Sequence, residues 1–404
     1  MAEVTQRSNV GKSLVWDVPL RLSLYLFALL LPLEDIIGRV GLGFLGGVKL
    51  FGVMIAGALV VKVSADTKGF GSLIKNILTP ISLSAFLFIV WSLISVLWAP
   101  NPAWALVRVS TYVGLFIVMQ AVGLLKREHV KRMWELLLVG AALSVPLGFI
   151  LPPPSEMLAA SGRFTSGGQD PNDYANLIVV VLGVVFYGIL TFRTEVRGRL
   201  WRFALLSSAL VAMAAVPLSL SRTALINLLA IVLASFLLRR AVKSAIRLAV
   251  FVALTLVFVV LLFPGFTEQM VQRYSTLQEL RQEETWAGRI DIWRAAVTVF
   301  TERPLTGVGA GNFAFVSPNY SYHAALIAAT REDGGGGVAH NMFLSVLAET
   351  GVIGFLLLRT HPCHRDKQHS AVFISFARPP CFSSAFSQGV IGHRDAVGNQ
   401  GRVL

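Results

Sequence analysis

The sequence predicts an all-α polytopic membrane protein with about ten transmembrane helices and one long extracytoplasmic loop between helices nine and ten. The first observation is composition: 14% of the residues are charged and 55% are hydrophobic, whereas soluble domains carry about 25% charged residues. The second is a series of apolar stretches long enough to cross a bilayer. The third is the net charge of +13, most of which lies in short connections between those stretches and therefore argues against a nucleic-acid partner.

The apolar stretches define the predicted organisation. They lie at residues 18–34, 42–61, 77–98, 105–125, 134–151, 174–192, 202–220, 223–238, 247–264 and 341–358. We therefore expect nine helices within residues 1–264, an extracytoplasmic catalytic loop at 265–340, a tenth helix at 341–358 and a polar tail at 359–404. A very tight turn joins helices seven and eight.

The charges of the connections predict the orientation. Fifteen cations occupy the four connections after helices two, four, six and eight: Lys62, Lys68, Lys75, Lys126, Arg127, Lys131, Arg132, Arg193, Arg197, Arg199, Arg202, Arg239, Arg240, Lys243 and Arg247. The opposite short connections contain Arg39, Arg163 and Arg222. Because cytoplasmic loops carry the excess of Lys and Arg, we expect a cytoplasmic N-terminus and an outward-facing long loop.

Three predicted outer segments carry the candidate site: residues 152–173, the turn at 219–223 and the long loop. Arg222 lies at the bilayer edge, where a cation is costly unless it snorkels, pairs or binds an anion. In the long loop, residues 285–297 predict an amphipathic helix with Arg289 beside its apolar face. That face comprises Trp286, Ile290, Trp293, Val297 and Phe300. Arg222 and Arg289 are either ordinary surface cations or a pair of guanidinium groups suited to a phosphate or diphosphate.

His340 follows a glycine run at residues 334–337, which we expect to be flexible, and opens the last apolar stretch. The positive end of a helix dipole favours the neutral imidazole, and a neutral imidazole can act as a general base toward a hydroxyl group. The alternative is a residue that only begins the helix. Glu349 is expected to be a structural acid, and Lys49 and Arg108 are expected to snorkel.

The residue pattern predicts neither a metal nor a cofactor. The outer segments contain no His, Cys and Asp cluster with metal-ligand spacing. His361, Cys363, His364, His369 and Cys381 in the tail fit no common zinc pattern. The glycines at 307, 309 and 311 follow a predicted helix and not a strand, which argues against a dinucleotide site.

Several short motifs occur in a specific order: residues 95–102, 170–175, 219–223, Arg289 with Trp293, 304–309, 340–341 and 349–354. In this order and spacing, from about residue 20 to residue 358, the chain resembles the O-antigen ligase family of bacterial membrane glycosyltransferases. The family includes O-antigen ligases, polysaccharide polymerases and protein O-oligosaccharyltransferases.

The resemblance implies a GT-C-like fold and metal-independent transfer of a glycan from an undecaprenyl-diphosphate carrier to an acceptor hydroxyl at the outer face of the bacterial inner membrane. It implies that Arg222 and Arg289 hold the diphosphate and that His340 is the base. Arg163, Asn172 and Asn341 are further expected substrate contacts. The acceptor is lipid A-core, a growing polysaccharide or a protein. The alternatives are a transporter or flippase of lipid-linked glycans and an inactive family member.

The tail departs from this resemblance, because the family continues into further membrane helices after the stretch at 341–358. Here a polar sequence with both cysteines follows residue 358. We hypothesise that a frameshift or sequencing error put the tail out of register. Reading the other two frames of the encoding DNA after codon 358 tests this, and finding no apolar continuation in either frame would refute it.

Overall fold

The structure is a computed structural model that describes residues 17–39, 47–65, 69–151, 162–168, 170–191, 198–237, 242–263, 265, 267–268, 271, 284–331 and 333–359. Every regular element in these ranges is a helix. Residues 152–161 of the predicted outer segment, most of residues 264–283 and the tail from residue 360 lie outside the described ranges.

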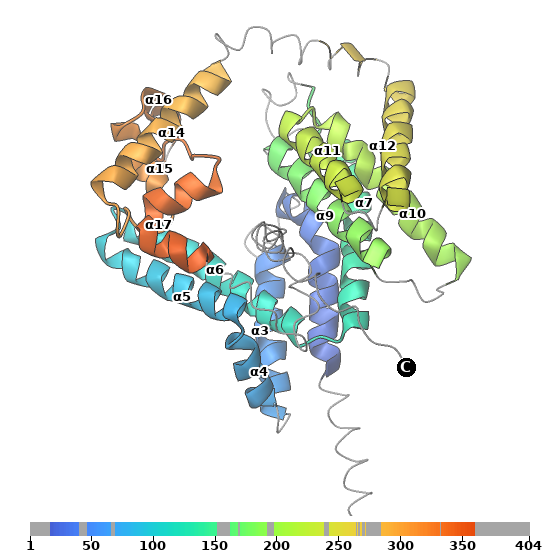
Figure 1. Cartoon of the computed structure of the whole chain (residues 1–404), viewed down its shortest axis with the longest axis horizontal. Helices are drawn as coiled ribbons and strands as arrows, with labels where there is room; N and C mark the ends of the chain where they lie inside the picture. Colours follow the sequence, from blue (N-terminus) through green and yellow to red (C-terminus); the bar gives the residue numbers. More distant parts are fainter. Residues whose placement is uncertain are drawn as a thin grey trace, which may run out of the picture. The chain divides into compact units, whose positions relative to one another are not determined.

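A helix overlaps each predicted apolar stretch, although several helices begin before it, such as α7, which begins at Arg127 (Figure 1). The first covers residues 17–30 and continues into η1 (Leu31–Leu33) and α2 (Glu34–Ile37). The others are α3 (Gly47–Ala65), α5 (Pro80–Ile94) with η4 (Ser95–Trp98), α6 (Pro102–Gly123), α7 (Arg127–Ile150), α9 (Pro171–Thr191), α10 (Arg199–Leu218), α11 (Arg222–Leu237), α12 (Val242–Leu262) and α17 (Met342–Arg359). The shorter α4 (Gly69–Ile77) lies in the second connection, and α14 (Glu284–Glu302), α15 (Phe313–Val316), η5 (Ser317–Asn319) and α16 (Tyr322–Thr330) lie in the long loop.

Four of these helices are long and apolar enough to cross a membrane: Pro80–Trp98, Pro102–Gly123, Arg127–Ile150 and Arg199–Leu218. Shorter apolar helices occupy Leu50–Ala65, Pro171–Val184, Arg222–Ala234, Ala249–Leu262 and Met342–Leu358. The molecule is therefore an all-helical, multi-pass membrane protein across the described ranges. The count of ten crossings stays a prediction.

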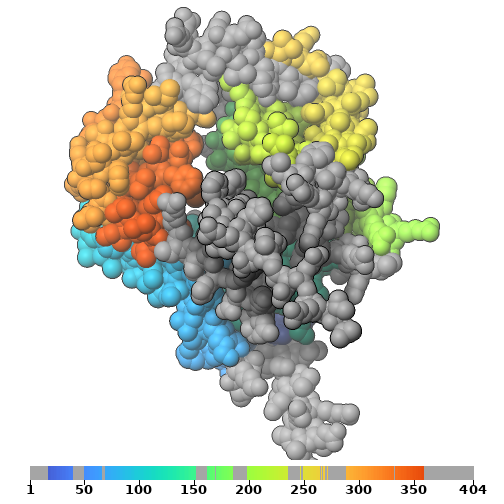
Figure 2. All heavy atoms as spheres, viewed as in Figure 1, coloured from blue at the N-terminus to red at the C-terminus, as the bar shows by residue number. Residues whose placement is uncertain are grey.

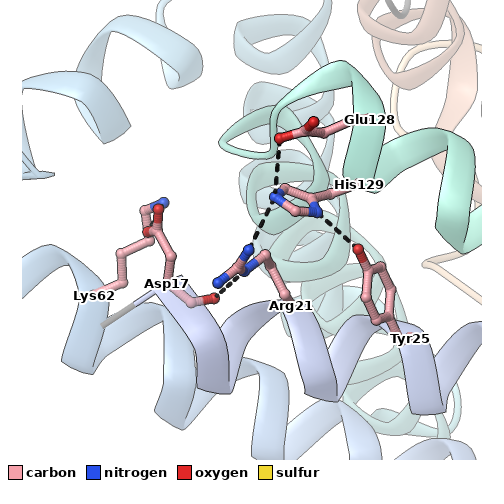
Figure 3. A network of polar contacts seen from close by, with 6 residues as sticks. All are labelled: Asp17, Arg21, Tyr25, Lys62, Glu128 and His129. Atoms are coloured by element: carbon pink, nitrogen blue, oxygen red, sulfur yellow. Dashed lines mark hydrogen bonds and ion pairs between the residues drawn. The ribbon is translucent and has the colours of Figure 1, made fainter. Parts of the chain in front are cut away.

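One set of contacts joins the N-terminal segment to the predicted even-numbered connections (Figure 3). The Lys62 ammonium group lies 2.6 Å from the Asp17 carboxylate. At the start of α7, the two ring nitrogens of His129 lie 3.1 Å from Arg21 Nη1 and 2.8 Å from the Tyr25 hydroxyl group. Arginine can only donate hydrogen bonds, so His129 accepts from Arg21 and is neutral in this arrangement.

The same set of contacts extends to the sixth connection. The indole N–H of Trp201 donates to the Glu135 carboxylate at 3.2 Å, and the Arg132 guanidinium group lies 4.7 Å from the centre of the Trp201 ring. Trp201 lies in connection six, Arg132 lies in connection four, and Glu135 follows connection four directly. The N-terminal segment and these even-numbered connections therefore meet on one side of the helices.

A second set of contacts joins the odd-numbered connections. Gly167, in the fifth connection, lies against Ile36 and Arg39 at the end of the first helix. The backbone N–H of Phe164 donates to the Leu218 carbonyl group at the seventh connection, at 3.1 Å. The third connection meets the long loop, because the Asn101 N–H donates to the Asn312 side chain at 2.7 Å. The contacts thus follow the predicted alternation of the connections.

The tenth predicted helix is broken, which corrects the expectation of one continuous span at 341–358. At Gly351 the backbone has φ 65° and ψ −170°, which is not helical. A side chain there would collide with the Leu305 backbone, and the Val352 N–H donates to the Pro304 carbonyl group at 2.8 Å. The long loop thus enters the helix at the break, and each half of α17 is shorter than the roughly 20 residues of a span.

The long loop folds into a helical layer on α17, and α17 packs along α5 (Figures 1 and 2). Its core consists of Ile292, Ala295, Ala296, Val299, Val308, Phe313, Ala324, Ala339 and Ala348. The predicted buried face of α14 is therefore wrong in two positions: Ile290 is 42% exposed and Val297 is 49% exposed. The small alanines explain the difference, because they let neighbouring helices approach closely.

The glycine run is packed and not open, which corrects a second expectation. Gly335, Gly336 and Gly337 are buried, and the Gly336 N–H donates to the Ala314 carbonyl group at 2.7 Å. A side chain at Gly336 would lie 2.7 Å from Pro318. Glycine is required here because the backbone passes so close to its neighbours.

Candidate active site

Arg163 joins two of the predicted outer segments. Its Nε donates to the Ser219 carbonyl group at 3.0 Å, and its Nη2 donates to the Asn172 side-chain oxygen at 2.9 Å. The first partner lies in the turn between α10 and α11, and the second lies in the first turn of α9. One guanidinium fork therefore connects both segments, with each bond shorter than 3.2 Å.

The turn that precedes Arg222 is buried and caps the helix α11. Ser219 and Ser221 are 0% exposed, and Leu220, at 3%, has a left-handed backbone with φ 51°. The Ser221 hydroxyl group accepts from the Ala224 N–H at 3.3 Å, as an N-cap residue does. Arg222 is consequently the first residue of α11. The positive end of that helix adds to the guanidinium charge and favours an anion at this position.

The segment before α9 is held by its own side chains. The Asp170 carboxylate accepts from the Asn172 N–H at 2.7 Å, which begins the helix at Pro171. Beneath it, the Tyr174 hydroxyl group lies 2.9 Å from the Ser144 hydroxyl group, and Ser166 donates to the Ser144 carbonyl group at 2.7 Å. These buried contacts fix the backbone that presents Asn172.

His340 lies at the junction between the packed glycine run and α17. Its backbone has φ 46°, an uncommon conformation for a residue other than glycine, and its side chain is exposed. Ala339, directly before it, is 1% exposed, and its carbonyl group accepts from the Trp293 indole N–H at 2.7 Å. His340 is thus an exposed side chain on a fixed backbone.

Arg289 lies on α14, the helix that contacts the His340 segment through Trp293. It is half-buried and lies one helical turn before Trp293, so both side chains project from the same side of the helix. The Trp293 hydrogen bond to Ala339 joins this part of α14 to the segment that carries His340. Asn341 acts as the N-cap of α17, because its side-chain oxygen accepts from Phe343 N–H at 3.0 Å and from Leu344 N–H at 3.3 Å.

Electrostatic interactions connect His340 to the fifth connection. Burial raises the pKa of the Asp173 carboxyl group, the charge of Asp170 raises it further, and the His340 imidazole opposes this rise. Burial also raises the pKa of Asp35, and Asp173 adds to that shift. The interactions place His340 within electrostatic range of Asp173, the neighbour of Asn172. Contacts therefore link two of the predicted outer segments, and an electrostatic interaction relates His340 in the third to them.

This arrangement combines a cation at a helix N-terminus, a second cation on α14 and an exposed imidazole. Guanidinium groups bind phosphate oxygens through paired hydrogen bonds, and an imidazole can take a proton from a hydroxyl group. Among the described residues, no group of three or more His, Cys, Asp or Glu side chains is placed to hold a metal ion.

The sequence reasoning missed two contributions to this region. The sequence analysis included Asp173 only as part of the motif at residues 170–175. Its electrostatic interaction with His340 depends on tertiary structure alone. Trp293 was assigned to an apolar face, yet its indole N–H is the group that fixes Ala339. Tryptophan carries one polar atom on a large ring, and a buried indole N–H generally finds a partner, but no sequence signal identifies that partner.

Comparison with known proteins identifies the domain that carries most of this site. Residues 208–358 match the family model described as O-antigen ligase. The match begins within α10 and includes Arg222, Arg289 and His340. A search of the curated proteins finds no match. The match supports an O-antigen ligase family assignment for the domain at residues 208–358.

Proposed function

We propose that the protein transfers a glycan from an undecaprenyl-diphosphate carrier to an acceptor hydroxyl group, without a metal ion, in cell-surface polysaccharide biosynthesis. The reaction takes place on a GT-C-like scaffold at the outer face of the bacterial inner membrane, and the N-terminus is cytoplasmic. Family membership supports a lipid-linked glycan as donor. The fifteen cations in the even-numbered connections support this orientation.

The observation that carries the proposal is the Arg163 fork. It joins the turn of Arg222 to Asn172, and Asp173 brings His340 into electrostatic range of the same place. These interactions support the inference that residues separated by more than a hundred positions in the chain face one region. In the proposal, that region contains the cations Arg222 and Arg289 and the exposed imidazole of His340.

In the proposed reaction, the acceptor oxygen attacks the anomeric carbon of the donor sugar. His340 takes the hydroxyl proton as the new carbon–oxygen bond forms. The bond between the anomeric carbon and the diphosphate oxygen breaks, and undecaprenyl diphosphate leaves with the bonding electrons. Arg222 and Arg289 stabilise the growing negative charge on the diphosphate, which is where fixed cations lower the barrier most. Asn172, Arg163 and Asn341 are expected to line this region, Arg163 and Asn341 chiefly by fixing its backbone.

The test is glycan transfer by the purified protein in nanodiscs, with an undecaprenyl-diphosphate donor and no added metal. Arg222→Ala and Arg289→Ala should each lower kcat by about 100-fold or more, as the loss of one charge-stabilising donor does. His340→Ala should lower it by a similar factor, as expected for a general base. The matched control is Arg303→Ala, which removes an exposed arginine from the same loop and should leave kcat unchanged.

Three results would contradict the proposal. Transfer that persists in His340→Ala would exclude His340 as the base. Equal losses in Arg303→Ala and Arg289→Ala would show a general charge effect in place of a diphosphate site. Movement of the donor across the bilayer without transfer would support the flippase alternative. Supplying lipid A-core, a polysaccharide repeat or a protein in separate assays distinguishes a ligase from a polymerase or a protein glycosyltransferase.

A further inference from the structure

The break in α17 is held by a set of contacts that ends at a glutamate. The Val308 N–H donates to the Ala348 carbonyl group at 3.0 Å, and the Gly309 N–H donates to the Glu349 carbonyl group at 2.8 Å. These carbonyl groups precede the break, where the helical partners of a continuous helix are lost. The turn at residues 307–313 supplies the missing donors.

The Glu349 side chain makes the next contact in this series. Its carboxylate accepts from the Gly311 N–H at 2.8 Å, and the Phe313 N–H also donates to it. Gly307, Gly309 and Gly311 all have positive φ angles, of 63°, 101° and 72°. Such alternation turns successive N–H groups toward one side and creates an anion-binding concavity. Here the anion is the protein's own carboxylate.

The turn also contacts η4 and α6. The Ala310 N–H donates to the Ser95 hydroxyl group at 3.0 Å. A side chain at Gly311 would lie 3.0 Å from Arg108 Cβ and 3.2 Å from Arg108 Nε, and Arg108 is within electrostatic range of Glu349. The charge of Arg108 therefore interacts with the Glu349 carboxyl group, and the expectation that Arg108 snorkels stays a prediction.

The two ends of the short N-terminal half of α17 are thus both anchored. At its first end, Trp293 holds Ala339 and Asn341 caps the helix. At its last end, Glu349 and its backbone bind the turn at 307–313. Residues 341 to 349 span about 12 Å of helix at 1.5 Å per residue. A rigid element of this length transmits a displacement at Glu349 to His340.

We infer that Glu349 is a positioning residue for His340: its carboxylate binds the turn at 307–313 and thereby fixes the helix that presents the imidazole. The inference rests on the proposed function for its kinetic consequence. It extends that function by assigning a role to the turn at 307–313, which touches neither diphosphate nor acceptor. Displacement of a catalytic group by about 1 Å can lower a rate by about 100-fold.

The test compares Glu349→Gln with Glu302→Gln, a matched change at an exposed glutamate of α14. Hydrogen exchange of the backbone amides is measured first and requires no substrate. Glu349→Gln should raise exchange in residues 307–313 and 339–344 by about tenfold or more and leave residues 170–182 unchanged. In the transfer assay, kcat should fall by about 10- to 100-fold, while KM for the donor stays within about threefold.

A second variant covers the case in which Glu349→Gln does not fold. Ser95→Ala removes the acceptor of the Ala310 N–H without touching α17, and it should raise exchange in both segments and lower kcat by a smaller factor. Unchanged exchange at 339–344 in both variants would overturn the inference, as would raised exchange with an unchanged kcat. If the wild-type protein performs no transfer, the proposed function fails, and the exchange measurement still decides whether Glu349 fixes the His340 segment.

Discussion

Replacing Gly351 by alanine tests the most unexpected feature of the fold, the break in α17. At φ 65° and ψ −170°, any residue other than glycine costs about 1–3 kcal/mol. The added Cβ would also collide with the Leu305 backbone and lie 2.7 Å from the Thr306 nitrogen. Residues 304–306 would have to move and would lose the bond from Val352 N–H to Pro304, worth about 1 kcal/mol.

Together these effects predict a loss of about 2–4 kcal/mol of unfolding free energy. Thermal unfolding of the detergent-solubilised protein measures it, and we expect the midpoint to fall by about 2–5 °C. The matched control is Gly114→Ala in α6, where a Cβ meets no atom within 4 Å. That change should stabilise the helix by up to about 1 kcal/mol. If Gly351→Ala is as stable as Gly114→Ala, the helix continues through residue 351 and the break is refuted.

Three further changes have defined outcomes. Trp293→Phe removes the donor to the Ala339 carbonyl group, 2.7 Å away, and should lower the unfolding free energy by about 1–3 kcal/mol. It should also lower kcat more than it changes KM, and an unchanged kcat would refute the role of Trp293 in positioning the site. Hydrogen bonds from the hydroxyl group and backbone N–H at the start of α16 lower the pKa of Asp291. The contribution of Asp291 to the unfolding free energy is therefore complete above about pH 4, the unfolded pKa. It is lost as the pH falls through the lower pKa of the folded state. Unfolding midpoints between pH 3 and 7 should show a steeper acid loss in the wild type than in Asp291→Asn, and parallel curves would contradict this. Tyr25→Phe removes the hydroxyl group 2.8 Å from His129 Nδ1 and should lower stability by about 1 kcal/mol while transfer is unchanged; a fall in kcat that exceeds the loss of folded protein would connect this side to catalysis.

Sequence patterns predicted the helices well because a bilayer imposes a simple rule on them. Each crossing needs about 20 apolar residues, and such stretches are visible without knowledge of any neighbour. A helix overlaps each predicted stretch. The alternation of the connections was also predictable, because the Lys and Arg bias depends only on local composition. The contacts of Arg21 with His129 and of Arg163 with Ser219 follow this alternation.

The long loop was less predictable because tertiary packing decides its conformation. Ile290 and Val297 are as apolar as Ile292 and Val299, yet the alanines beside the latter pair allow the closer helix contact, so that face is buried. A run of glycines favours flexibility in isolation. In the folded chain, the same lack of side chains lets Gly336 fit against Pro318.

The break in α17 shows the same limit at a single residue. Glycine is tolerated inside apolar membrane helices, so Gly351 alone did not predict an interruption. The break depends on the turn at 307–313, whose N–H groups replace the lost helical donors. Nothing within residues 341–358 encodes that turn.

The residues of the site could be named from motifs, but their assembly could not. Arg163 reaches Ser219 through a carbonyl group, and every residue has one, so no residue type marks this partner. Trp293 likewise binds the carbonyl group of Ala339, and Glu349 binds the N–H group of Gly311. A hydrogen bond between a side chain and the backbone is specific in the folded structure, but the residue type of the backbone partner does not reveal it. In this protein those bonds join the segments that carry the candidate site residues, so the proposed site depends on side chains that the proposed chemistry does not use.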